Sequence, residues 1–288
     1  MKICIAQSAS IKGNVQKNIE NHLKIIASAI ELQAHLIIFP ELSITNYEPK
    51  LAQELATDAD DLVFNPFQKL SNQNNITIGV GMPTIQTKGG SSKDKEHREH
   101  IKISLILFRP NGRKMVYSKQ MLDADEKPFF TCGNSQNFLD IEGKKIAFGI
   151  CFESLQRRHF VNAKQGGADI YIASVAKSQN GLEKAFEYFP KIAKEFKTPV
   201  LMSNCIGPCD DFLGMGHSAV WNQNGMLLEK LDSENQGILV YDTETESIEM
   251  EILETAKPIP ELMPRILGPN NQDTEAFTST RYPFCNDR

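Results

Sequence analysis

The chain has 288 residues, of which 41% are hydrophobic and 23% charged, and its formal net charge is −5. This composition is typical of a globular protein, and the acidic balance argues against nucleic acid or an anionic membrane surface as a partner. No apolar run approaches the ~20 residues that cross a bilayer, and the short apolar stretch that follows Lys2 is too brief for a signal peptide.

The N-terminal half alternates strand-like apolar runs with an amphipathic segment. From Asn14, a plausible helix cap, apolar residues recur at helical spacing as far as Ile30. The Pro-Asn-Gly turn within residues 109–119 predicts a hairpin. Strands are expected at residues 2–7, 34–42 (ending at Pro40), 75–83 and 100–108.

The C-terminal half continues the alternation. A helix is expected from about Ser154 to the glycines at 166 and 167, and a second helical segment is expected to be interrupted or restarted at Pro190. Strands are expected at 144–151, 168–176, 199–207, 217–231 and 237–244. Strands mixed with helices indicate an α/β fold, and the Asn-Gly turns near 111 and 224 favour some antiparallel pairing, hence a mixed sheet.

The spacing of the cysteines indicates the cellular compartment. They lack the dense spacing of a secreted disulfide scaffold, so we expect free thiols in the reducing cytoplasm. Cys205 and Cys209 lie close in sequence, but no second Cys/His pair completes a zinc site, and a strand end followed by a turn explains them better. His97 and His100, in the polar loop 88–100, have no carboxylate scaffold for a metal. The six cysteines are Cys4, Cys132, Cys151, Cys205, Cys209 and Cys285.

Three reactive or charged residues each stand at the end of a predicted strand: Glu41, Lys119 and Cys151. Each alone has an ordinary interpretation, as a helix-start carboxylate, a surface lysine and a core thiol. Strand ends are where α/β proteins bind ligands, however, and together the three supply a base, a cation and a thiol. This is the set needed for acyl transfer through a thioester. Pairing of the cysteine with His159 or His217 is the alternative thiol chemistry.

The segments that contain these residues, FPELSITNY, YSKQML and GICFE, resemble the three motifs of the nitrilase superfamily of carbon–nitrogen hydrolases. Residues 214–225 resemble a further strand of that family, and the resemblance runs from Lys2 to about Asp242. It implies a four-layer α-β-β-α sandwich, usually built into dimers. We therefore expect a catalytic domain over residues 1–256 and a homodimer or larger homo-oligomer. The tail over 257–288 has no clear regular pattern, and it either packs on a neighbouring subunit or is disordered.

The resemblance also implies roles for individual residues. Glu41 is implied as the general base, Lys119 as the oxyanion-stabilising cation and Cys151 as the nucleophile, whose pKa a nearby cation should lower. Glu126 resembles a second glutamate that positions the lysine and the substrate, and the backbone N–H of Phe152 would be an oxyanion donor. No metal or organic cofactor is required by this chemistry.

The sequence leaves several classes of substrate open. Asn46 stands where many members have glycine, Ser118 where arginine is common, and the residues after Cys151 differ from those of carbamoyl hydrolases. We expect an amidase acting on a small amide or carbamoyl compound. The alternatives are a nitrilase acting on a small nitrile and a catalytically silent binding module of the same fold.

Overall fold

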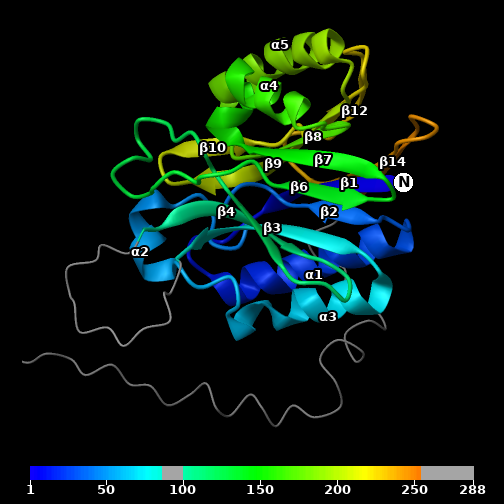
Figure 1. The fold of residues 1–288 in the computed structure, drawn as a ribbon. Coiled ribbons are helices and arrows are strands. Elements are labelled where there is room, and N and C mark those ends of the chain that lie inside the picture. Colours follow the sequence, from blue (N-terminus) through cyan, green and yellow to red (C-terminus); the bar gives the residue numbers. More distant parts are fainter. Residues whose placement is uncertain (86–99, 254–288) are drawn as a thin grey trace, which may run out of the picture. The chain divides into compact units, whose positions relative to one another are not determined.

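The structure is a computed structural model that describes residues 1–85 and 100–253. Within these ranges the elements form four layers (Figure 1). Helices α1 (Val15–Glu31) and α3 (Asn65–Asn74) cover one face of a folded sheet, and helices α4 (Arg157–Gln165) and α5 (Gln179–Phe196) cover the other. This is the α-β-β-α sandwich expected from the resemblance. The expected tail and most of the 88–100 loop, including His97, lie outside the described residues.

The sheet consists of two halves that are joined where the end of β1 pairs with β9 at Ser8 and Cys205. The first half has the order β14-β13-β1-β2-β3-β4-β5. Its strands β1, β2 and β3 are parallel, and the others pair antiparallel. The strands are β1 (Lys2–Ala9), β2 (Leu36–Ile38), β3 (Thr77–Thr84), β4 (Lys102–Phe108), β5 (Met115–Ser118), β13 (Gln236–Asp242) and β14 (Ile248–Leu253).

The second half has the order β12-β11-β9-β8-β7-β6, with β10 paired to β9. Strands β7, β8 and β9 are parallel, and antiparallel neighbours flank them, which confirms the mixed sheet. The strands are β6 (Phe138–Ile141), β7 (Lys144–Ile150), β8 (Ile170–Val175), β9 (Val200–Cys209), β10 (Phe212–Met215), β11 (Ala219–Trp221) and β12 (Leu227–Lys230).

The helices match the sequence patterns in part. Asn14 caps α1 by accepting a hydrogen bond from the Lys17 amide, as the sequence predicts. No helix in the described part of the chain has the length and apolarity of a membrane span. The helical elements are α1 (Val15–Glu31), η1 (Pro49–Leu51), α2 (Ala52–Leu55), η2 (Leu62–Phe64), α3 (Asn65–Asn74), η3 (Cys151–Leu155), α4 (Arg157–Gln165) and α5 (Gln179–Phe196).

Two helical predictions are corrected. The expected break at Pro190 is wrong, because α5 runs through this residue without interruption. Proline removes one backbone hydrogen bond, but the buried face of the helix packs on the second sheet half on both sides of the proline and holds it together. The helix expected from Ser154 begins only at Arg157, after the 3₁₀ turn η3 that contains Cys151.

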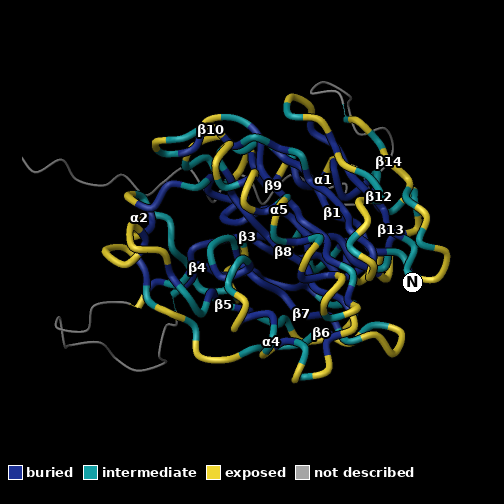
Figure 2. Tube along the Cα trace, turned by 90° about the horizontal axis from the view of Figure 1, so that it is seen from above, coloured by how far each residue is buried: buried dark blue, intermediate teal, exposed yellow. Residues whose placement is uncertain are grey.

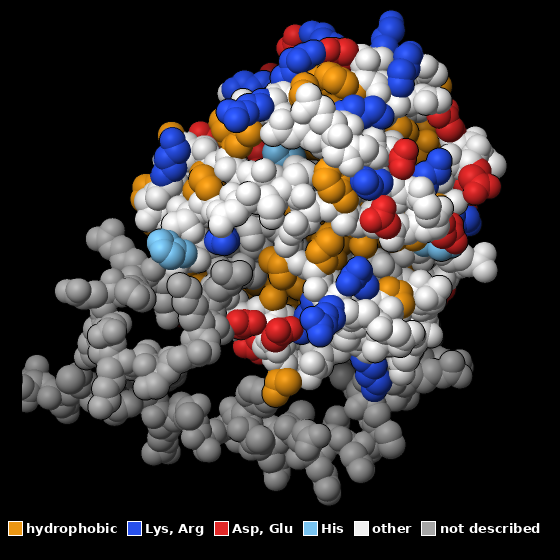
Figure 3. All heavy atoms as spheres, in the orientation of Figure 1, with side chains coloured by type: hydrophobic (Ala, Val, Ile, Leu, Met, Phe, Trp, Pro, Cys, Tyr) orange, Lys and Arg blue, Asp and Glu red, His pale blue; other side chains and the backbone are white. Residues whose placement is uncertain are grey.

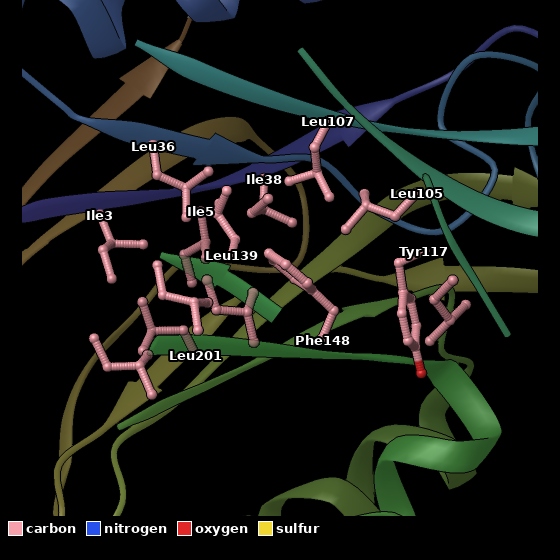
Figure 4. Close-up of a cluster of buried hydrophobic side chains, with 14 of the residues drawn as sticks. Ile3, Ile5, Leu36, Ile38, Leu105, Leu107, Tyr117, Leu139, Phe148 and Leu201 are labelled. Carbon is pink, nitrogen blue, oxygen red and sulfur yellow. The ribbon is translucent and has the colours of Figure 1, made fainter. Parts of the chain in front are cut away.

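The main core lies between the two sheet halves. Ile3, Ile5 and Leu105 from the first half meet Phe148 and Leu201 from the second (Figure 4). In Figure 2 the strands that carry this core form the buried centre of the molecule. Burying such side chains contributes about 1.5–3 kcal/mol each, so the core fixes how the strand ends of one half face those of the other.

Candidate active site

The three strand-end residues predicted from the sequence meet at one place between the sheet halves. Glu41 follows β2, Lys119 follows β5 and Cys151 follows β7. The ammonium of Lys119 donates to Glu41 Oε1 at 2.8 Å and to Glu126 Oε1 at 2.5 Å. Both carboxylates and the lysine are no more than 2% exposed. The structure therefore brings Glu126, the fourth predicted residue, into the same cluster.

Glu41 is held in place by backbone packing and has one free oxygen. A Cβ on Gly81 would lie 2.4 Å from the amide nitrogen of Leu42, so only glycine in β3 lets the turn after β2 pack this closely. Glu41 Oε2 is buried and has no hydrogen-bond partner among the described residues. Burial raises the pKa of Glu41 to about 7, although Lys119 opposes the shift. Such a carboxyl can accept and return a proton near neutral pH.

Cys151 occupies a strained backbone position at the start of η3. Its φ is +43°, in the left-handed region that non-glycine residues rarely adopt. The thiol is half-buried and donates a weak hydrogen bond of 3.5 Å to the carbonyl oxygen of Ala176. Burial, and then the charge of Glu41, raise the pKa of this thiol to about 11. The expectation that a nearby cation would lower it is wrong on balance, because desolvation outweighs the two lysines that act against it.

Lys119 stays charged. Burial opposes the ammonium form, but the acidic groups around the nitrogen outweigh it and hold the pKa of Lys119 well above its ordinary value. Phe152, which follows Cys151 in the chain, lies in the first turn of η3, where backbone N–H groups have no acceptor within the helix. A charged donor and a backbone donor are thus available near the thiol.

Lys177 is a site residue that sequence reasoning missed. It follows β8, is 3% exposed, and its Nζ lies 4.0 Å from Cys151 Sγ. Among the charges that favour the thiolate, Lys177 acts more strongly than Lys119. The signal in the sequence was the same one that revealed the other three: a charged residue directly after an apolar strand.

Glu153 is a second missed residue, although it belongs to the GICFE segment. Its buried carboxylate accepts hydrogen bonds from the backbone amides of Ile150, Gln120 and Met121, at 2.8, 2.6 and 3.1 Å. It also accepts one from the Tyr117 hydroxyl at 2.7 Å. Glu153 therefore ties the turn that holds Cys151 to the segment that follows Lys119.

The histidines offered for a Cys–His pair have other partners. His159 is buried between the hydroxyls of Tyr117 and Tyr171, 2.8 Å from each. Burial lowers the pKa of His159, so the ring is neutral. His217 bonds the carbonyl oxygen of Leu231. Neither of these contacts is with Cys151.

The backbone conformation explains how asparagine can stand at position 46, where many members of the family have glycine. Asn46 has a φ of +67°, which glycine adopts freely and asparagine tolerates better than most residues. Its amide donates to Pro208 O at 2.8 Å. The neighbouring Tyr47 donates its hydroxyl to Glu126 at 3.1 Å, so this turn also supports the cluster.

A pocket of about 530 Å³ opens onto the thiol. Cys151, Phe152 and Glu126 line it, whereas Glu41 and Lys119 are buried and are not among its lining residues. The other residues that line the pocket are Tyr47, Asp123, Asp125, Leu155, Gln156, Ala176, Lys177, Ser178, Gly181, Lys184, Tyr188 and Phe212.

Cys205 and Cys209, the cysteine pair considered for a zinc site, lie on β9 with their sulfurs 3.7 Å apart, buried beside Tyr47 and Phe212.

Comparison with known proteins identifies the family. A family model described as carbon-nitrogen hydrolase matches residues 2–250. The chain belongs to this family. This confirms the resemblance to the nitrilase superfamily that the sequence motifs indicated.

Relatives in this family have several names. A probable nitrilase from Schizosaccharomyces pombe is 23% identical over 93% of this chain and 98% of its own length. A glutamine-dependent NAD(+) synthetase from Aquifex aeolicus is 24% identical over 83% of this chain, which spans only 41% of that protein.

Solved structures show the same fold. The amidase from Nesterenkonia sp. AN1, determined as a variant in complex with butyramide, is 21% identical and superposes with a TM-score of 0.74. The match covers 85% of this chain and 92% of that one. Another variant of that family member carries the acetamide moiety of fluoroacetamide at its active-site cysteine. The common fold confirms the sandwich architecture predicted from the resemblance.

Proposed function

We propose that this protein hydrolyses the carbon–nitrogen bond of a small amide through a thioester formed on Cys151. One observation carries the proposal: Lys119 holds one oxygen of Glu41, the other oxygen is buried with no hydrogen-bond partner among the described residues, and the carboxyl group interacts with the Cys151 thiol, which opens to a pocket. A carboxylate fixed in this way can exchange protons with a thiol or a water molecule. The amidase structures with the same fold support an amide as the substrate.

In the first half of the reaction, Glu41 accepts the thiol proton as the sulfur of Cys151 attacks the amide carbon. The negative charge that develops on the amide oxygen is stabilised by Lys119 and by the N–H of Phe152, and each preorganised donor of this kind contributes about 3 kcal/mol. Glu41 then gives its proton to the departing nitrogen. The carbon–nitrogen bond breaks, ammonia leaves and a thioester remains on the sulfur.

In the second half, Glu41 takes a proton from water, and the resulting hydroxide attacks the thioester carbon. The carbon–sulfur bond breaks, the carboxylic acid leaves, and the proton returns from Glu41 to the sulfur. One carboxylate acts as base, acid and base again. Since its pKa is about 7, it can serve in each of these roles near neutral pH.

A nitrile is the second candidate, favoured by the relative named as a probable nitrilase. The same thiol can attack a nitrile carbon, and hydrolysis again yields acid and ammonia. Comparing matched pairs, such as butyramide and butyronitrile, decides between the two, because a nitrilase must release ammonia from the nitrile at least as fast as from the amide.

The proposal is tested by measuring ammonia release from a panel of small amides, carbamoyl compounds and nitriles. Cys151→Ala is expected to lower turnover by at least about 10³-fold, since no other described residue that lines the pocket carries a thiol to form the thioester. The matched control is Cys132→Ala, which removes an exposed thiol outside the pocket. Equal activity in the Cys151→Ala variant, or no release from any compound by the unmodified protein, would contradict the proposal.

The pH dependence provides a separate prediction. Glu41 is a base only when ionised, and its pKa is raised to about 7, so kcat/KM for the amide should rise with pH and reach half its maximum near pH 7. The measurement is kcat/KM at constant ionic strength, with circular dichroism as the control for folding. A midpoint near the ordinary carboxyl value of about 4.3 would show that Glu41 is not the titrating base.

A further inference from the structure

Lys177 is held rigidly at the wall of the pocket. Its backbone N–H donates to Asn204 Oδ1 at 2.9 Å, and its carbonyl oxygen accepts from the Met215 amide at 3.0 Å. The side chain runs beside Gly181, whose missing Cβ would lie 3.5 Å from Lys177 Cβ. Both residues line the pocket. These contacts fix the backbone of Lys177, and the ammonium lies 4.0 Å from Cys151 Sγ.

The charge of Lys177 is not balanced by the protein. Lys119 contacts two carboxylates, whereas no carboxylate in residues 1–85 or 100–253 lies within ion-pair distance of the Lys177 ammonium. The neighbouring sulfur does not neutralise it either, because the raised pKa keeps the Cys151 thiol protonated near neutral pH. A buried charge without a partner is costly, and this one faces a cavity that admits substrate.

The other charges of the pocket are distributed unevenly. Lys184, which also lines the pocket, lies on α5 two turns beyond Lys177, and the layer formed by α4 and α5 carries many Lys and Arg side chains (Figure 3). The acidic residues Asp123 and Asp125 come from the segment after β5 and are exposed. Glu126 is already engaged by Lys119. Near the thiol, Lys177 is therefore the cation that has no carboxylate within ion-pair distance among the described residues.

We propose that Lys177 binds a carboxylate of the substrate, so that the preferred substrate is a short amide that also carries an acid group. This inference rests on the proposed amidase function. An acyl group bound to Sγ extends into a cavity in which the ammonium of Lys177 lies within one short chain's reach. A charge-assisted hydrogen bond from an ammonium is about twice as strong as a neutral one, and it supplies the partner that this cation lacks.

The test compares succinamate with butyramide, which have the same four-carbon chain and differ in a carboxylate against a methyl group. In the unmodified protein, kcat/KM is expected to be on the order of 10- to 100-fold higher for succinamate. Lys177→Met should lower this ratio by a similar factor. The control is Lys191→Met on α5, the helix that begins two residues after Lys177, where the lysine is 70% exposed and pairs with Glu187 outside the pocket.

Binding to the Cys151→Ala variant tests recognition apart from turnover. Succinamate should bind to this variant measurably by calorimetry, and the additional change Lys177→Met should weaken binding by about tenfold or more. The inference would be overturned if kcat/KM for succinamate and butyramide were about equal in the unmodified protein. It would also be overturned if Lys177→Met lowered kcat/KM for both compounds equally and left their ratio unchanged, because Lys177 would then stabilise the sulfur of Cys151. Hydrolysis of neutral amides with no succinamate binding would refute this inference alone. Specific succinamate binding without hydrolysis of any amide would refute only the proposed function.

Discussion

Glu41→Gln is expected to lower turnover by about 10³-fold or more and to leave an acyl group attached to Cys151. Glutamine has the shape of glutamate but cannot take a proton from the thiol or from water. Lys119 and Lys177 still favour the thiolate, so a reactive substrate can acylate the sulfur slowly. Without a base to activate water, the thioester then accumulates.

Intact-protein mass spectrometry measures this directly. The added mass identifies the acyl part of the substrate, which makes the variant a means of screening a mixed panel of amides, carbamoyl compounds and nitriles. The control is the double variant in which Cys151 is also replaced by alanine, and it must show no adduct. Near-normal turnover by Glu41→Gln on any substrate of the unmodified protein would remove this carboxylate from the mechanism.

Glu153→Ala is expected to cause the largest loss of stability of any single change near the site. It would leave the buried amide of Ile150 and the half-buried amides of Gln120 and Met121 without their acceptor, at a cost of about 1–3 kcal/mol for each. Because partial relaxation reduces the sum, we expect roughly 4 kcal/mol, or a fall of about 8–16 °C in Tm. Thermal denaturation followed by circular dichroism measures the change.

The same variant should also lose activity at temperatures where it remains folded. Glu153 joins the turn of Cys151 to the segment after Lys119, so its removal loosens the relative position of nucleophile and cation. The matched control is Glu183→Ala, an exposed residue of α5 that accepts a hydrogen bond from the Gln179 side chain. An unchanged Tm together with unchanged kcat would show that the hydrogen bonds of Glu153 neither stabilise the fold nor position the site.

The sequence predicted the parts of the site that share a simple signal. Glu41, Lys119 and Cys151 each follow an apolar strand. The strands β2 and β7 belong to parallel sets, whose ends lie at one edge of a sheet, and β5 runs in the same direction as β3 because two antiparallel pairings separate them. The fold class was predictable for the same reason, since the alternation of apolar runs and amphipathic segments is local. The hairpin between β4 and β5, with Asn111 at φ +52°, was predictable from its turn residues.

The features that the sequence did not predict depend on contacts between segments that are distant in the chain. Glu153 follows no periodic pattern that distinguishes a surface carboxylate from one that accepts four hydrogen bonds. The pKa of Cys151 is set by how fully the two sheet halves exclude water, which no local pattern reveals. Proline usually interrupts a helix, and only the packing of α5 on the second sheet half shows why this helix continues through Pro190.

The division of the sheet into two halves has a consequence for the way the enzyme fails. Glu41 and Lys119 belong to one half, and Cys151 and Lys177 belong to the other, so neither half holds the complete set of groups that we propose for the reaction. A separation of the halves by about an ångström, too small to change the strands themselves, already removes the geometry that proton transfer requires. Activity is therefore a more sensitive gauge of early thermal damage than any spectroscopic measure of secondary structure. A preparation of this protein can age into an inactive form that still looks fully folded.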